Sequence, residues 1–243
     1  MAQPYYITTP IYYVNDRPHI GHAYTTLACD VLARFKRLDG FDVTFLTGTD
    51  EHGQKVEKAA SDKGVSPQSF TDEVSQNFRD LTAQMNFSND DFIRTTEGRH
   101  RLACQEIWKR LRERDHIRLG NYAGWYSVRD EAFFTETEIV DGKAPTGAPV
   151  EWVEEPSYFF NLSHWQKPLL DFYEANPDFV GPESRFNEVK SFVQGGLRDL
   201  SVSRASFKWG IPVPNDPDHV MYVWLDALTN YITASGWPTE SES

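Results

Sequence analysis

The side chains best suited to chemistry form a short run near the amino terminus, Pro18-His19-Ile20-Gly21-His22. The run follows an aromatic, β-branched segment typical of a strand, and it opens a segment with helical spacing. A helix start offers unpaired N–H groups and the positive end of the helix dipole, which suit a phosphate group. His19 and His22 are spaced so that both rings can donate to phosphoryl oxygens, and Gly21 would let a flat base approach the backbone. A capped helix with two solvated histidines is the alternative.

A second polar run, residues 47–53, follows the next expected strand and contains Asp50. Ligands in open α/β sheets bind at the carboxyl ends of strands, so Asp50 and the histidine pair should meet there. A carboxylate beside a phosphate site needs a cation opposite it, and a substrate ammonium group is the obvious candidate. On local sequence alone, an N-cap role for Asp50 in the following helix is equally favoured.

The elements that must position these residues alternate between strand and helix over residues 1–115. Strands are expected over 5–13, 42–47 and 91–94, and helices over about 18–38, 53–63, 67–85 and 97–114. This order predicts an α/β fold with a parallel sheet and right-handed crossovers.

The pattern changes after residue 115. Glycines, prolines and short aromatic runs between Gly120 and Pro156 indicate antiparallel strands of a different domain. Helices are expected near 165–176 and 185–194. A proline-rich stretch over 211–217 then leads to a strand over 220–223 and a helix over 224–234.

Composition excludes several classes of protein. Apolar residues are 40% of the chain and the net charge is −12, which argues against disorder and against a protein that coats nucleic acid. The two cysteines, Cys29 and Cys104, are too few for a disulfide framework. The sequence has no apolar run long enough to span a membrane and no secretory signal, so we expect no membrane partner and a cytoplasmic location.

Longer strings carry a resemblance to a known family. They are Tyr5-Tyr-Ile-Thr-Thr-Pro-Ile-Tyr-Tyr-Val-Asn15, Pro18-His-Ile-Gly-His-Ala-Tyr-Thr-Thr26, Phe45-Leu-Thr-Gly-Thr-Asp-Glu-His-Gly53, Asp91-Asp-Phe-Ile-Arg-Thr-Thr96 and Tyr222-Val-Trp-Leu-Asp-Ala-Leu228. In this order they resemble methionyl-tRNA synthetase, a family of class I aminoacyl-tRNA synthetases, over essentially the whole chain. The histidine signature alone would indicate only the class.

The resemblance implies a truncated Rossmann-type catalytic domain with an inserted α+β connective-peptide domain. The catalytic halves would be residues 1–115 and 211–243, and the insertion would be 116–210. The implied reaction joins methionine and ATP into methionyl-adenylate and then transfers methionine to tRNA(Met). ATP would be a substrate with Mg²⁺, and the protein is expected to be a monomer.

Roles for individual residues follow from matching positions. His19 and His22 would be catalytic and, with Gly21, would bind ATP. Methionine would be held by Asp50 and the backbone of Ile11 at its ammonium group, and by the Tyr13 hydroxyl at its sulfur. Its side chain would be walled by Trp224, Ala227, Leu228 and Tyr231, although Leu228 stands where some relatives carry proline.

Two departures from the family pattern modify these expectations. Ser127, Asp130 and Ala144 stand where many relatives carry zinc-binding cysteines, so we expect no zinc, and packing of Tyr122, Trp125, Phe133 and Phe134 would hold the hairpin. The family's Lys-Met-Ser-Lys-Ser loop and anticodon-binding domain are not found in the sequence. We therefore expect a part of a longer ligase, with weak adenylation activity or none on its own.

Two other functions stay open at this point. One is a different nucleotidyltransferase with a His-x-Gly-His signature, against which the long insertion argues. The other is a non-catalytic module that binds methionine or RNA.

Overall fold

The computed structural model describes residues 2–130, 132–134 and 136–238. The chain forms two compact units, which are considered separately below. The first comprises Met1–Lys109 and Ser206–Ser243, and the second comprises Arg110–Ala205. The boundaries near residues 115 and 210 that we drew from the sequence remain a proposal about domains.

A parallel sheet forms the centre of the first unit. Its strands are β1 (Pro4–Thr8), β2 (Tyr12–Tyr13), β3 (Asp42–Asp50) and β4 (Asp91–Arg94). The long strand β3 pairs in parallel with each of the other three. The single strand expected over 5–13 is therefore two strands, and Pro10 lies at the break, where it has no N–H to donate.

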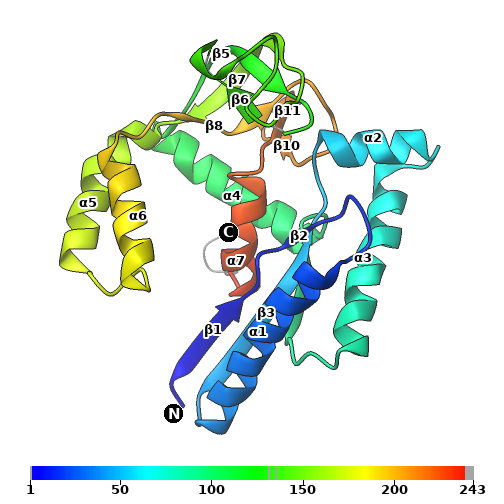
Figure 1. Cartoon of the computed structure of the whole chain (residues 1–243), viewed down its shortest axis with the longest axis vertical. Coiled ribbons are helices and arrows are strands. Elements are labelled where there is room, and N and C mark those ends of the chain that lie inside the picture. The colour runs from blue at the N-terminus through cyan, green and yellow to red at the C-terminus, as the bar shows by residue number, and fades with distance from the viewer. Residues whose placement is uncertain (1, 131, 135, 239–243) are drawn as a thin grey trace. The chain divides into compact units, whose positions relative to one another are not determined.

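Among its described residues, this unit also contains five helices and a small antiparallel pair of strands. They are α1 (Ile20–Leu38), α2 (Gln54–Asp62), α3 (Pro67–Gln84), α4 (Gly98–Glu113, which runs past the unit boundary), α7 (Asp226–Ala234), β10 (Pro212–Val213) and β11 (Asp216–Met221). Helix α1 runs alongside β1 and β3 (Figure 1), and α7 packs against β3 and β4. One buried cluster joins Tyr12 and Val14 to Phe70 and Phe78 of α3. The core thus lies directly under the strand ends that carry the candidate site.

The second unit contains an antiparallel sheet with strand order β6-β5-β7-β8 and a pair of helices (Figure 1). Its elements are β5 (Ile117–Ser127), β6 (Ala132–Phe134), η1 (Glu136–Glu138), β7 (Glu151–Phe160), η2 (Leu162–Trp165), α5 (Gln166–Ala175), α6 (Glu183–Gln194), β8 (Leu200–Ser201) and β9 (Ser203–Arg204). No helix among the described residues is long and apolar enough to cross a membrane.

A polar network occupies the region in which many relatives carry zinc-binding cysteines. Asp130, between β5 and β6, accepts hydrogen bonds from Ser127 at 2.8 Å and from Thr146 at 2.6 Å, while Ala144 is buried in the segment between η1 and β7 that also contains Thr146. Trp125 contacts Trp152 edge-on across the sheet. Of the expected aromatic cluster, the side chains of Tyr122 and Phe133 lie outside the described residues. A carboxylate with hydroxyl donors therefore links the β5–β6 connection to the segment that precedes β7.

Candidate active site

The histidine pair caps the first helix. His19 is the N-cap residue of α1, and its Nδ1 accepts a hydrogen bond from the Gly21 N–H at 3.1 Å. His22 Nδ1 accepts one from the His19 N–H at 3.0 Å. A neutral ring that accepts at Nδ1 carries its proton on Nε2. Capping therefore fixes the tautomer in which each ring offers an Nε2–H donor, so the capped-helix alternative and the phosphate-binding role are compatible.

The environment of His22 favours this neutral form. Burial lowers the pKa of His22 below its usual value, and repulsion from His19 lowers it further. The two ring centroids lie 3.9 Å apart, and the His22 ring also contacts Tyr12 and Phe78 edge-on. The aromatic core thus holds His22 in place beside β2.

Gly21 has a structural role that the sequence did not reveal. A Cβ atom built on Gly21 would lie 2.9 Å from Cε1 of His19 and 3.1 Å from its Nδ1. Any side chain here would push the His19 ring out of its cap. Gly21 is therefore needed to leave room for the His19 imidazole, whether or not a nucleobase also approaches its backbone.

Asp50 ends strand β3 beside the expected methionine contacts. It is the Cα partner of Tyr13 in the β2–β3 pairing. The N-cap residue of α2 is Gly53, with φ of +111°, so the N-cap alternative for Asp50 is wrong. A Cβ at Gly53 would lie 3.1 Å from the buried Tyr13 hydroxyl, so the hydroxyl lies against this glycine. Ile11 lies between β1 and β2, two residues before Tyr13.

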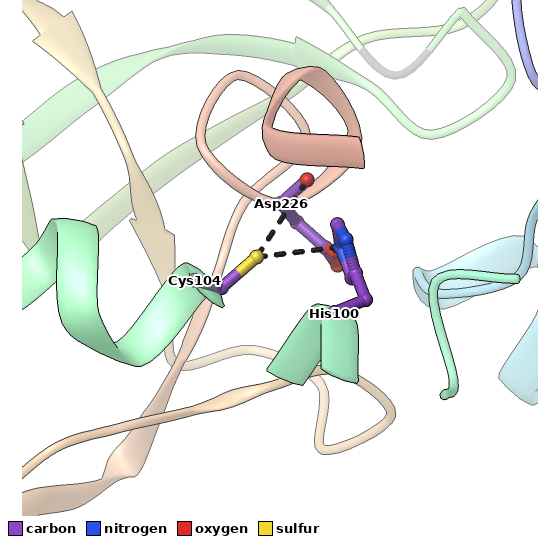
Figure 2. Close-up of side chains that lie close together, drawn as sticks. All are labelled: His100, Cys104 and Asp226. Carbon is purple, nitrogen blue, oxygen red and sulfur yellow. Dashed lines mark hydrogen bonds and ion pairs between the residues drawn. The ribbon is translucent and has the colours of Figure 1, made fainter. Parts of the chain in front are cut away.

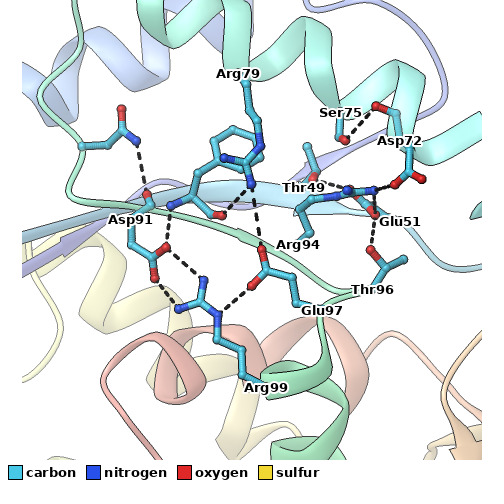
Figure 3. Close-up of polar contacts among 12 residues, drawn as sticks. Thr49, Glu51, Asp72, Ser75, Arg79, Asp91, Arg94, Thr96, Glu97 and Arg99 are labelled. Carbon is cyan, nitrogen blue, oxygen red and sulfur yellow. Dashed lines mark hydrogen bonds and ion pairs between the residues drawn. The ribbon is translucent and has the colours of Figure 1, made fainter.

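Glu51, for which the sequence pattern predicted no role, fixes the end of β3 to β4. Its fully buried carboxylate accepts from Arg94 Nε at 2.7 Å, Arg94 Nη2 at 2.9 Å, and the hydroxyls of Thr49 and Thr96 (Figure 3). A buried charge persists only when it is paired in this way. The signal available in the sequence was a second carboxylate directly after Asp50 at the end of a strand, with Arg94 at the end of another strand.

The expected methionine wall lies at the start of α7. Trp224 lies before α7, which begins at Asp226. The turn that contains Trp224 is nevertheless helical, because the Ala227 N–H donates to the Val223 carbonyl. Trp224 is 49% exposed and Leu228 is 54% exposed, whereas Ala227 is buried. The backbone carbonyl of half-buried Tyr231 accepts a hydrogen bond from the Tyr6 hydroxyl. Trp224, Leu228 and Tyr231 are spaced to share one face of this helix.

The predicted residues therefore converge on one end of the sheet. Tyr12 contacts His22, its neighbour Tyr13 pairs with Asp50, and His52 hydrogen-bonds Asp226 at the start of α7. Their roles toward ATP and methionine remain predictions. No role was predicted for His52, His100 or Asp226, although a lone aspartate within the apolar string Val223–Leu228 was an available sign of a buried, paired charge.

Comparisons with known proteins identify the family to which the chain is similar. A family model described as tRNA synthetases class I (M) matches residues 5–151 and 144–243. The Methionine--tRNA ligase of Rickettsia typhi is 66% identical over 244 residues, covering 100% of this chain and 48% of the relative. That of Mesorhizobium japonicum is 58% identical over 241 residues, covering 97% of this chain and 47% of the relative.

Solved structures give the same result. Mycobacterium tuberculosis methionyl-tRNA synthetase in complex with methionyl-adenylate superposes with a TM-score of 0.92 at 55% identity, covering 98% of this chain and 48% of that chain. The free-state structure of the same enzyme gives a TM-score of 0.81 at 51% identity, covering 99% and 47%. The chain thus spans about half the length of the relatives that it matches.

The parallel sheet and its histidine-capped helix are those of a class I synthetase catalytic domain, as we expected from the sequence. Within that class, the chain belongs to the methionyl-tRNA synthetase family.

Proposed function

We propose that this chain carries a methionine- and adenylate-binding site, and that the protein activates methionine with ATP and transfers it to tRNA(Met). The observation that carries the proposal is the placement of two capped histidines, Asp50 and the Trp224 turn around one end of a parallel sheet. The relatives named as methionine ligases, and the one bound to methionyl-adenylate, support the assignment.

In the proposed first step, a methionine carboxylate oxygen attacks the α-phosphorus of ATP. The bond between the α-phosphorus and the bridging oxygen breaks, and pyrophosphate leaves with Mg²⁺. Negative charge builds on the α-phosphoryl oxygens, which the Nε2–H donors of His19 and His22 would stabilise. In the second step, a terminal ribose hydroxyl of tRNA attacks the aminoacyl carbonyl and AMP leaves.

Methionine would be recognised at both of its ends. Asp50 and the Ile11 backbone would take the ammonium group, and Gly21 would lie under the nucleotide. Trp224, Ala227, Leu228 and Tyr231 would surround the thioether, for which aromatic contacts are worth about 0.3–1.5 kcal/mol. The Tyr13 hydroxyl, which lies against Gly53, would contact the sulfur.

Further parts of the proposal concern partners and location. We propose a zinc-free hairpin at Ser127, Asp130 and Ala144, a monomer for the whole protein, and a cytoplasmic location. Metal analysis after dialysis against a strong chelator tests the first of these, and stoichiometric zinc would refute it.

Calorimetry on this chain tests the central proposal. We expect methionine to bind more tightly than isoleucine, and Asp50→Asn to weaken methionine about 10- to 100-fold, because a charge-assisted hydrogen bond is lost. Methionine-dependent pyrophosphate exchange reports the chemistry separately. A nucleotidyltransferase of another kind would ignore both amino acids, and a non-catalytic module would bind methionine without coupling to ATP.

A further inference from the structure

A chain of buried polar side chains lies behind the site and belongs to none of the roles above. Asp226 Oδ2 lies 2.6 Å from His52 Nδ1, and Asp226 Oδ1 lies 2.9 Å from His100 Nε2. Cys104 Sγ lies 3.3 Å from the same His100 nitrogen (Figure 2). All four residues are at most 6% exposed. The carboxylate of Asp226 is therefore held between two imidazoles in a dry environment.

Two of the three elements that meet here, the end of β3 and the start of α7, carry expected methionine contacts, and the third is α4. His52 follows Asp50 by two residues, at the end of β3, and His100 lies in the first turns of α4. Asp226 is the first residue of α7, directly between Trp224 and Leu228 along the chain. One hydrogen bond thus connects the strand end of the ammonium anchor to the helix that bears the expected side-chain wall.

The two partners of this hydrogen bond favour each other's charged form. Burial opposes the charge on Asp226, but His52 and His100 outweigh it and lower the pKa of Asp226 to about 2. Burial likewise opposes the charge on His52, yet Asp226 raises the pKa of His52 above its usual value. A buried pair of this kind is sensitive to geometry, because either charge left alone is strongly disfavoured.

The capping geometry of α7 also indicates that Asp226 connects the start of this helix to its neighbours. Leu225, its N-cap residue, makes no side-chain capping bond. An aspartate in the first turn ordinarily satisfies the helix's own N–H groups or its dipole. Here both carboxylate oxygens are directed at histidines from two other elements, so the helix start is tied to its neighbours.

A metal ion is the other arrangement that His100, Cys104 and Asp226 suggest, since their ligating atoms lie within 4.8 Å of one another. Zinc takes cysteine as the thiolate. Burial, and then the charge of Asp226, raise the pKa of the Cys104 thiol, which keeps its proton. The His100–Asp226 distance is that of a hydrogen bond, and Cys104 lies within reach of the Leu225 and Asp226 carbonyls.

We propose that His52, Asp226 and His100 are positioning residues for the methionine site, holding the start of α7 at a fixed place relative to Asp50. This inference rests on the proposed function. Glu51 fixes the same strand end to β4 on the residue between Asp50 and His52, so Asp50 would be held from two directions.

Asp226→Asn tests the inference, because it keeps the shape of the side chain and removes its charge. We expect methionine affinity to fall about 10- to 100-fold, because a displaced α7 would weaken the contacts that it makes with the substrate, and a hydrogen bond to a charged group is worth about 1.5–3 kcal/mol. Hydrogen exchange of the α7 amides should accelerate about tenfold, because the tie to β3 is weakened. His52→Gln should change both measurements in the same direction.

Asp30→Asn is the matched control. Asp30 is also a buried carboxylate of the first unit, and it accepts from Ser88 and Arg34 rather than from the site. We expect it to accelerate exchange in α1 and to leave both α7 exchange and methionine affinity unchanged.

The outcomes separate the two claims. The positioning role would be overturned if Asp226→Asn left α7 exchange unchanged. It would also be overturned if Asp226→Asn and Asp30→Asn lost methionine affinity equally. One equivalent of zinc that disappears in Asp226→Asn would overturn it as well. If the unmodified chain binds no methionine, the proposed function fails, while the exchange experiment still decides whether this network holds α7.

Discussion

At the scale of single residues, the histidine pair depends on a glycine between its members. Alanine at position 21 would place a Cβ atom 2.9 Å from the His19 ring. In a helix, glycine to alanine ordinarily stabilises by about 1 kcal/mol, which would offset the loss of a cap of similar size. Stability and function should therefore respond differently to this substitution.

We expect Gly21→Ala to leave the thermal stability of this chain nearly unchanged. In the longer protein, we expect it to lose about tenfold or more in ATP-dependent pyrophosphate exchange, because the His19 donor is displaced. Calorimetric melting and pyrophosphate exchange measure the two effects. Gly98→Ala is the control, since a Cβ there, at the start of α4, meets nothing within 4 Å. Equal effects of the two substitutions would show that the His19 contact is unimportant.

The second residue-scale prediction concerns pH. The capping bond requires a neutral His22, and the pKa of His22 is lowered in the folded chain, chiefly by burial. The folded state therefore binds fewer protons than the unfolded state, so the stability from this cap is complete above about pH 6.5 and is lost as pH falls through the lowered pKa.

His22→Asn provides the comparison, because an amide oxygen can accept the same bond without titrating. The unmodified chain should lose stability relative to His22→Asn, by about 1 kcal/mol, as the pH is lowered from 7.5 to 5. Thermal melting at several pH values measures this difference. A difference that is independent of pH would mean that His22 does not cap as a neutral ring.

At the scale of elements, the connective loop of the second unit depends on one carboxylate. Thr146 lowers the pKa of Asp130 most, with burial opposing it and Ser127 adding to it, so Asp130 is charged and accepts from both hydroxyls. We expect Asp130→Ala to make residues 128–150 several-fold more sensitive to limited proteolysis, because buried Ala144 and Ala148 lose their neighbouring anchor. Chelator treatment of the unmodified chain should have no such effect. If the chelator made residues 128–150 of the unmodified chain more sensitive to proteolysis, a bound metal would be indicated instead.

Elements also show how far the sequence could be interpreted. Local patterns predicted the strands around Asp42–Asp50 and Asp91–Arg94 and the helix that follows His19, since each depends on spacing within one segment. The resemblance brought Asp50 and Trp224 into one hypothesis. The break at Pro10 and the N-cap at Gly53 were missed, because a pattern does not reveal which backbone groups find partners.

The buried networks were beyond prediction for a different reason. His52 and Asp226 are far apart in the chain, and neither pattern nor propensity links them. Glu51 and Arg94 pair across two neighbouring strands whose register only the folded sheet defines. Such contacts are consequences of the fold, and they decide how firmly the predicted residues are held.

At the scale of the whole molecule, one face of α1 is unusually apolar and open. Ile20, Tyr24, Val31, Phe35 and Leu38 follow helical spacing and are each at least 57% exposed. Beside it, among the described strands, β1 pairs with β3 alone, which leaves its other edge open. Large exposed apolar patches and open sheet edges both favour association.

We therefore expect this 243-residue chain to self-associate at micromolar concentration and to bind a hydrophobic dye. Replacing Val31 and Phe35 together with glutamate should shift sedimentation toward the monomer and reduce dye binding, while leaving methionine affinity unchanged. Phe192→Glu is the control, because Phe192 is 72% exposed on α6 of the other unit and lies in no comparable stripe. A dye-free monomer of the unmodified chain would show that α1 is covered in solution. Dissociation by Phe192→Glu would instead place the contact on the second unit.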